Sequence, residues 1–312
     1  MHPAYSVILF TTASGAGYGL LALLGLTGAS HGAASSVAFG ATAMLLALGL
    51  ITVGLLSSTF HLGHPERAWR AFSQWRSSWL SREGVAAVLT YIPACIFGLA
   101  WVFGGSDTLI TITGYITAFM AMVTVFTTSM IYASLPTIRQ WRHFMVVPVY
   151  LVFALATGAV LLFALATLFG RSGIPALGVI TIVGLGLAGL AKLVYWAGID
   201  RMKPKYTMGD ATGLGGKVRQ WEVPHTSENF VQREMGFKVA RKHAAKLRMI
   251  CIALLAVSLV AVWAAFSLGG AAAPLLAVVA TVLTAIAVVM ERWLFFAQAK
   301  HVVTLFYGEQ AV

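Results

Sequence analysis

Residues 145–169 read MVVPVYLVFALATGAVLLFALATLF, a run of 25 residues without a charged side chain. As a helix this run would be about 37 Å long, enough to cross the roughly 30 Å hydrocarbon core of a bilayer. In lipid every backbone N–H and C=O must be satisfied within the segment, and the run lacks the alternation that a barrel strand needs. It therefore predicts a membrane-spanning helix.

Seven other runs have the same character, and the composition agrees with them. Hydrophobic residues make up 59% of the chain and charged residues only 10%, too few to cover a soluble protein. The first five residues carry no Lys or Arg, so the first run predicts a span rather than a cleavable signal peptide. We predict an all-α integral membrane protein, an eight-transmembrane-helix bundle forming a single membrane domain over 1–312. The other spans are expected at 5–27, 36–60, 84–104, 108–133, 175–197, 247–268 and 274–298.

Charge predicts the orientation of the bundle. Eight spans put both chain ends on one face of the membrane, together with 61–83, 134–144 and 198–246; we name it the basic face. Of the 21 Lys and Arg, only Arg171 falls clearly on the opposite face. Cytoplasmic loops carry the Lys and Arg excess, so both termini are expected in the cytoplasm. Topology thus explains the net charge of +11, and no nucleic-acid partner is indicated.

The segment 198–246 is too long for a simple connection. Its glycine cluster at 209–216 lacks the spacing of a phosphate-binding loop. Its last part, 233–243, can form a basic helix that leads into the seventh span and attracts anionic lipid. We expect this long basic cytoplasmic loop to dock a partner, and a lipid-facing or loosely ordered loop is the alternative.

Small residues inside the runs predict how the helices pack. Gly15 and Gly19 have G-x-x-x-G spacing, which favours close approach of two helices within the chain or, alternatively, contact with another protein of a complex. Cys95 and Cys251 lie inside apolar runs without C-x-x-C spacing. They are expected to be small buried side chains, and neither a metal site nor an iron–sulfur site is expected on this chain.

Ionisable groups gather at one depth of the membrane. The stretch 59–72 reads TFHLGHPERAWRAF and follows the second run directly. Further polar groups lie at or near the ends of other runs, all in the half toward the basic face. The residues concerned are His61, Glu83, Tyr132, Lys192, Glu291 and Arg292.

This one-sided placement favours a site for the head of an amphipathic molecule. An ion or proton channel would need polar groups across the full depth of the membrane. A quinone fits better, because its ring oxygens accept hydrogen bonds and its reduction consumes protons. A His and a carboxylate near water, such as His61 and Glu83, could relay those protons.

Other interpretations of the same groups stay open. A His at a helix end is often an interfacial hydrogen-bonding group, and Glu291 and Arg292 can pair with each other or reach toward water. Arg67 and Arg70 could bind lipid phosphates. A secondary transporter would show internal repeats and broken helices near the midplane, and no clear repeat is visible. None of the eight His falls near the middle of a span, so no haem is expected.

The residues then resemble a known family. The segment 60–69, FHLGHPERAW, resembles the H-L-G-x-P-x-R-A motif of the membrane anchor subunit of dimethyl sulfoxide reductase. The segment 80–83, LSRE, looks like that family's L-S-x-E segment at the start of the next helix. Tyr132 with Pro136 and Trp141, and Glu291 with Arg292, resemble later landmarks.

The resemblance implies a three-part complex in the bacterial inner membrane. A molybdopterin protein would carry the substrate site and a ferredoxin-like protein the iron–sulfur clusters, while the anchor binds quinone, either ubiquinone or menaquinone. His61 and Arg67 would lie near the quinone, and Glu83 would support that region. The quinone-pocket candidates are then His61, Arg67, Tyr132, Glu291 and Arg292. A role for His64 is not implied, because the family has another residue there.

The loop 198–246 departs from the reductase anchor and looks like the branch that anchors cytoplasmic sulfite-oxidising molybdoenzymes. The charge rule independently puts the motif-bearing face in the cytoplasm. In that branch electrons run from sulfite through the iron–sulfur protein to quinone. The alternative within the family is a quinol-dependent reductase of S- or N-oxides. A purely structural anchor is the third possibility.

Overall fold

The computed structural model describes residues 4–28, 36–170, 175–222, 227, 229–235 and 239–312. Within them, 8 helices are long and apolar enough to cross a membrane, which confirms the predicted number of spans. The described residues form isolated bridges but no strand. The long helices are α1 (Tyr5–Gly28), α2 (Val37–Ser57), α3 (Trp79–Val102), α4 (Asp107–Ala133), α5 (Val146–Leu168), α6 (Pro175–Asp200), α9 (Val239–Leu268) and α10 (Ala272–Ala297).

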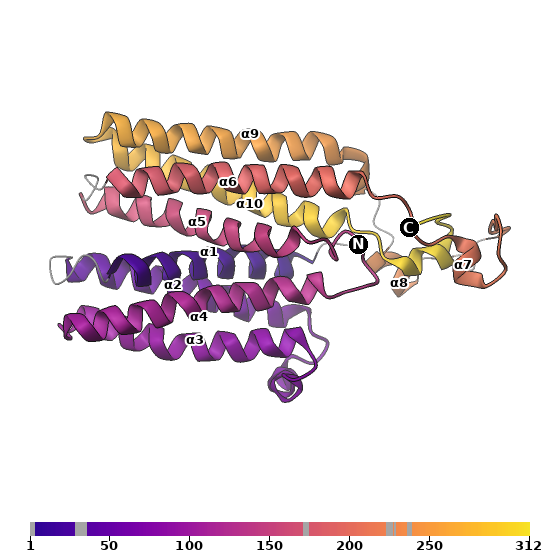
Figure 1. Ribbon diagram of the computed structural model, residues 1–312, viewed down its shortest axis with the longest axis horizontal. Helices are drawn as coiled ribbons and strands as arrows, with labels where there is room; N and C mark the ends of the chain where they lie inside the picture. Colours follow the sequence, from indigo (N-terminus) through magenta and orange to yellow (C-terminus); the bar gives the residue numbers. More distant parts are fainter. Residues whose placement is uncertain (1–3, 29–35, 171–174, 223–226, 228, 236–238) are drawn as a thin grey trace.

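These helices run side by side in one bundle, with α1 near its middle (Figure 1). Helix α1 packs against α2, α4, α5 and α10 and so joins the first four spans to the last four. Buried residues make up 67% of the α1 span and 72% of the α5 span, against less than half of each other span. The two helices therefore form the core, and the remaining six turn one side toward lipid. Helix α1 begins and α10 ends at the same end of the bundle (Figure 1).

Glycines bring the core helices together. A Cβ added to Gly19 of α1 would lie 1.7 Å from the carbonyl oxygen of Ala154 in α5. One added to Gly25 would lie 2.2 Å from the carbonyl oxygen of Gly114 in α4. Gly15 has open space around its Cβ position, so only one residue of the predicted G-x-x-x-G pair makes a close crossing.

The two cysteines differ in their surroundings. Cys251 is buried, as expected. The prediction for Cys95 is wrong, because its position in α3 faces outward. An apolar run shows that a residue lies within a span, but not which side of the helix it occupies.

The link between α2 and α3 consists of two short 3₁₀ helices, η2 (Ser58–His61) and η3 (Pro65–Gln74). Helix α3 then begins at Trp79 rather than at the expected 84, because the Ser78 side chain caps it by accepting from the N–H of Ser81. Glu83 is thus on the second turn of α3 and buried.

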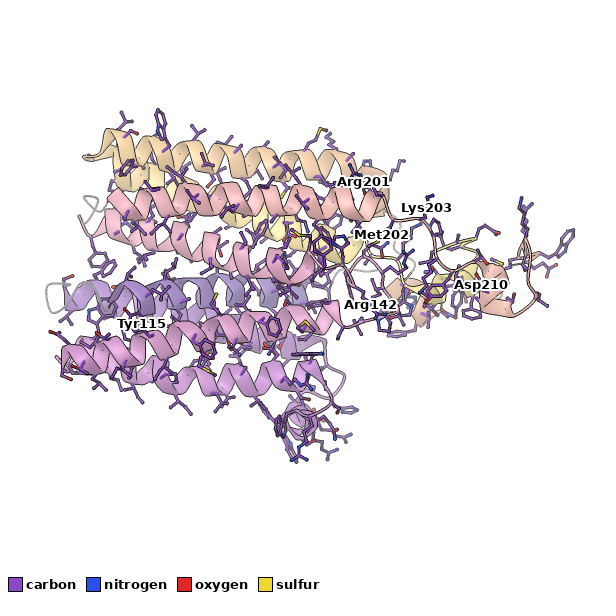
Figure 2. All side chains as sticks on the ribbon, viewed as in Figure 1. Tyr115, Arg142, Arg201, Met202, Lys203 and Asp210 are labelled. Carbon is purple, nitrogen blue, oxygen red and sulfur yellow. The ribbon has the colours of Figure 1, made fainter. Side chains whose placement is uncertain are left out.

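A small extramembrane region covers the basic face, with helices α7 (Met208–Thr212), α8 (Phe230–Met235) and η4 (Val302–Tyr307). The N–H groups of Lys205 and Tyr206 donate to the carbonyl of Val312. Thr207 and Asp210 form a capping box on α7, and the hydrogen bonds from Thr207 lower the pKa of Asp210. Figure 2 shows Arg142, Arg201 and Lys203 at this end of the bundle.

Two long helices extend into the segment 198–246 from its two ends. Helix α6 continues to Asp200, and α9 starts at Val239 and runs unbroken to Leu268. The basic lead-in to the seventh span is therefore helical from Val239 onward.

Candidate functional site

Three charged side chains meet inside the bundle, and we name them the ion cluster: Lys192 of α6 with Glu291 and Arg292 of α10. Glu291 forms ion pairs with both Lys192 and Arg292. The relative exposure of the three residues is 0%, 0% and 2%. Two cations thus share one carboxylate in an apolar interior, which leaves the cluster with a surplus positive charge when all three groups are ionised.

Helix geometry explains how adjacent residues face different neighbours. Successive side chains on a helix point about 100° apart. Glu291 therefore reaches α6, while Arg292 turns toward α5, where its guanidinium carbon lies 4.0 Å from the ring centroid of Tyr150. Lys192 Nζ lies 4.2 Å from the ring centroid of Tyr195. Aromatic faces thus stabilise both cations by cation–π contact.

A second set of buried polar side chains is centred on Glu83 in α3. The hydroxyl of Thr128 in α4 donates to Glu83 Oε1 at 3.5 Å. One turn closer to the N-terminus of α4, the hydroxyl of Thr124 lies 2.9 Å from that of Thr90 in α3. The carboxyl group is therefore held among hydroxyls rather than opposite a cation.

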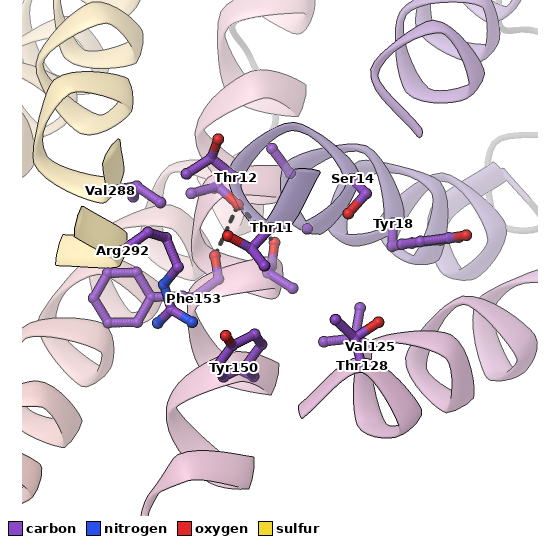
Figure 3. A pocket seen from close by; sticks show the side chains of 14 residues that line it. Thr11, Thr12, Ser14, Tyr18, Val125, Thr128, Tyr150, Phe153, Val288 and Arg292 are labelled. Carbon is purple, nitrogen blue, oxygen red and sulfur yellow. Dashed lines mark hydrogen bonds between the residues drawn. The ribbon is translucent and has the colours of Figure 1, made fainter. Parts of the chain in front are cut away.

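A pocket lies between these two groups, and we name it the polar pocket (Figure 3). Arg292 and Tyr150 line one end of it, and Tyr18 and Thr128 lie toward the other (Figure 3). Its volume is about 20 Å³. That is room for one water molecule or one ligand oxygen, but not for a ring.

Three polar atoms on the lining of the polar pocket make no well-formed hydrogen bond among the described residues: Tyr18 Oη, Tyr150 Oη and Arg292 Nη2. Their residues are 1%, 6% and 2% exposed. The Tyr150 hydroxyl and the Arg292 guanidinium are close enough to interact with each other, so they form a pair of neighbouring donors. Leaving a buried donor unsatisfied costs about 1–3 kcal/mol, more for a charged group. The pocket therefore has space for an oxygen that accepts hydrogen bonds.

The buried polar groups lie at a common depth in the bundle, measured from the basic face. Counted along their helices at 1.5 Å per residue, Glu83, Tyr150 and Arg292 all lie about 6–8 Å inside the basic face. The sequence predicted this shared depth from the positions of Glu83, Glu291 and Arg292.

Tyr132 lies beside the polar pocket without lining it. Its ring stacks on Tyr150 at a centroid distance of 5.8 Å and meets Trp141 edge-on at 5.2 Å. The indole N–H of Trp141 donates to the carbonyl of Phe295 at 3.0 Å. Tyr132 thus supports the side chain of Tyr150 from behind.

The motif segment after α2 contacts the start of α3, where Phe72 lies beside Gly84, but its charged side chains are exposed. The side chain of Arg67 is 56% exposed and near Glu66, which also pairs with His64 at 3.0 Å. His61 ends η2, and its side chain is outside the described part of the structure. Arg67 therefore does not join Glu291 and Arg292 in one pocket. Across the described residues, no group of three or more His, Cys, Asp and Glu is placed to hold a metal ion.

Sequence reasoning missed Tyr18, Thr128 and Tyr150. Each lies in an apolar run, where Thr and Tyr are ordinary helix residues that hydrogen-bond to the preceding turn or pack in the core. Thr128, for example, also donates to the carbonyl of Thr124 at 2.9 Å. Lys192 was identified near the end of its run, but its pairing with Glu291 depends on how α6 and α10 rotate.

Across the described residues, eight helices of membrane-spanning length define a multi-pass membrane protein, and the polar pocket lies among α1, α4, α5 and α10. Residues 1–308 match the family model of the DMSO reductase anchor subunit (DmsC), and the chain belongs to that family. It is 30% identical to a sulfite dehydrogenase subunit from Allochromatium vinosum over 330 aligned positions that cover all of both chains. The resemblance drawn from 60–69 and 80–83 is confirmed. The protein is a membrane anchor of an oxidoreductase complex.

Proposed function

We propose that this chain is the membrane anchor and quinone-binding subunit of a molybdenum and iron–sulfur oxidoreductase that passes electrons from sulfite to the quinone pool. The observation that carries the proposal is the polar pocket, a water-sized space lined by the hydrogen-bond donors of Tyr150 and Arg292. It supports the proposal because the chain belongs to a family of oxidoreductase anchors. Sulfite as the donor rests on the name of the Allochromatium vinosum relative, which makes it part of a sulfite dehydrogenase.

The complex would sit in the bacterial cytoplasmic membrane with the basic face inward. Nearly all Lys and Arg lie on that face, which the charge rule assigns to the cytoplasm. An iron–sulfur, ferredoxin-like protein would dock there on η3 and the extramembrane region and would in turn bind a molybdopterin protein. The substrate site would then be on the partner and the quinone site on this chain.

The buried residues suit quinone reduction, in which two electrons and two protons convert a quinone to a quinol. Arg292 and Tyr150 can donate hydrogen bonds to a ring oxygen, and the positive charge of Arg292 stabilises the negative charge that builds up there. Glu83, through Thr128, can hold a proton at the other end of the polar pocket. His61, at the end of η2, is the proposed entry point for protons, and Arg67 is an exposed cation that a docked partner could contact.

The test is sulfite-driven quinone reduction by the purified complex. Glu83→Gln keeps size and hydrogen bonding but cannot transfer a proton, so we expect turnover to fall about 100-fold while sulfite oxidation with an artificial acceptor is retained. His61→Ala should give a similar pattern. Asp107→Asn, at an exposed carboxylate on the opposite face of the bundle, is the matched control and should behave as wild type. Full quinone reduction by both Glu83→Gln and His61→Ala would overturn the assignment.

The second candidate is a quinol-dependent reductase of S- or N-oxides, favoured by the description of the family. The same preparation separates the two. Sulfite oxidation coupled to quinone reduction supports the first, whereas dimethyl sulfoxide reduction by quinol, without sulfite activity, supports the second.

A further inference from the structure

A second cavity lies deeper in the bundle, and we name it the apolar cavity. Its volume is about 180 Å³, ninefold that of the polar pocket. Its lining comes from α1, α2, α5 and α10 and is aliphatic except for threonines. The threonine hydroxyls that border both cavities, Thr12 and Thr157, donate to backbone carbonyls of their own helices. The cavity therefore offers volume and apolar surface but few free donors.

The two cavities adjoin each other. Both are lined by Thr12 and Ala16 of α1, Thr157 of α5 and Val288 of α10. Figure 3 shows Thr12 and Val288 at the end of the polar pocket where Arg292 lies. A molecule in the apolar cavity can therefore place one atom beside Arg292 and Tyr150.

The other end of the apolar cavity reaches the lipid-facing surface. Val289 is 47% exposed and Ala285 is also exposed, both on α10, and Leu50 on α2 is half-buried. Counted along α10 and α5, the cavity extends from about 12 to 24 Å below the basic face and so crosses the bilayer midplane at about 15 Å. A long hydrocarbon chain could leave here without crossing a polar layer.

We infer that the polar pocket and the apolar cavity form one quinone site: a ring oxygen enters the polar pocket, the ring lies at the junction, and the isoprenoid tail leaves through the apolar cavity between α2 and α10. The inference rests on the proposed function and adds the position and orientation of the quinone. The order of the two cavities sets the orientation, because free donors occur at the narrow end near the basic face and apolar surface occurs at the wide end near the midplane.

The chemistry favours a quinone over a phospholipid tail. An acyl chain would fill the apolar cavity but would offer no acceptor to the donors of Tyr150 and Arg292, which buried polar groups need. A phosphate headgroup carries several oxygens and cannot enter a pocket of about 20 Å³. A single ring oxygen satisfies both the size and the donors.

The test compares quinones that differ only in the tail. In the purified complex, Ala285→Phe fills the exit of the apolar cavity, so the KM for ubiquinone with its full isoprenoid tail should rise roughly tenfold. The KM for a tailless ubiquinone analogue should stay within about twofold, since the ring site is intact. Val282→Phe adds the same ring to a lipid-facing position of α10 that does not line the cavity, and it should leave both values unchanged.

The narrow end is tested separately with Tyr150→Phe, which removes one hydroxyl and keeps the ring. We expect the KM for both quinones to rise about five- to tenfold, independent of the tail.

Equal effects of Ala285→Phe on long-tailed and tailless quinone, or none on either, would overturn the tail route. The tail route would also be overturned if the bound lipids extracted from the purified complex included phospholipid but no quinone. Failure of the proposed function looks different, because the wild-type complex would then reduce neither quinone.

Discussion

At the scale of single residues, the ion cluster is the feature with the largest energetic consequence. Moving a charge into the bundle interior costs several kcal/mol even after relaxation, and a partner must offset this cost. Glu291 is the shared partner of Lys192 and Arg292. The three residues are therefore unequal: the loss of the carboxylate leaves two cations without a counter-ion, while the loss of Lys192 leaves a neutral pair.

This asymmetry predicts an order of stabilities. Glu291→Gln should lower the free energy of unfolding by about 3–5 kcal/mol, because two buried like charges remain. Lys192→Met, which keeps the length and apolar stem of the side chain, should cost clearly less. The measurement is thermal unfolding of the purified complex in detergent, with Lys203→Met on the exposed loop as the control. A larger loss for Lys192→Met than for Glu291→Gln would contradict the arrangement.

The ionisable side chains of the ion cluster and Glu83 could be identified from the sequence, because they interrupt apolar runs. Charged groups are costly inside a membrane, so such residues usually have a partner or a functional role. Their partners could not be predicted. Whether Glu291 faces Lys192 or lipid depends on the rotation of α10 against α6, which packing of the whole bundle decides. Tyr150 carries no signal of its own, since such residues are common in membrane helices.

At the scale of elements, hydropathy predicts that a helix exists but not where it begins. The third span was expected from 84, whereas α3 starts at Trp79. Ser78 caps the helix, and the Arg82 guanidinium lies 4.3 Å from the ring centroid of Trp79 while donating to the carbonyls of Trp75 and Arg76. Mean hydropathy counts Arg82 only as a charged residue and does not capture these contacts, which is why the predicted start of the span was too late.

Helix crossings give the prediction at this scale. Gly19→Ala would push a methyl group into the carbonyl of Ala154, so α1 and α5 must separate. We expect a loss of about 1–3 kcal/mol or more, as for overpacked cores, and less assembled complex in the membrane. Gly15→Ala, one turn earlier in open space, is the matched control and should assemble normally. The amount of assembled complex for each variant can be measured on a native gel after detergent extraction. Equal assembly of the two variants would contradict the close crossing of α1 and α5.

At the scale of the whole molecule, the sequence predicted the number of spans and the common end of α1 and α10 because both follow from length and apolar composition. The two cavities could not be predicted, since they are gaps between helices that are distant in sequence. Orientation in the membrane depends on charge alone. In the proposed function, this orientation would determine which compartment supplies protons to Glu83 and on which side a partner docks.

Cysteine labelling in cells tests the orientation. In a background with Cys95→Ser, Lys217→Cys puts a thiol in the extramembrane region of the basic face, and Thr108→Cys puts one at the exposed start of α4 on the opposite face. With the basic face inward, a membrane-impermeant maleimide should label Thr108→Cys when it is added to intact spheroplasts. It should label Lys217→Cys only after lysis. The reverse pattern would move the partner proteins and the proton source to the outside, and electron transfer from a cytoplasmic sulfite-oxidising module would then be impossible for this anchor.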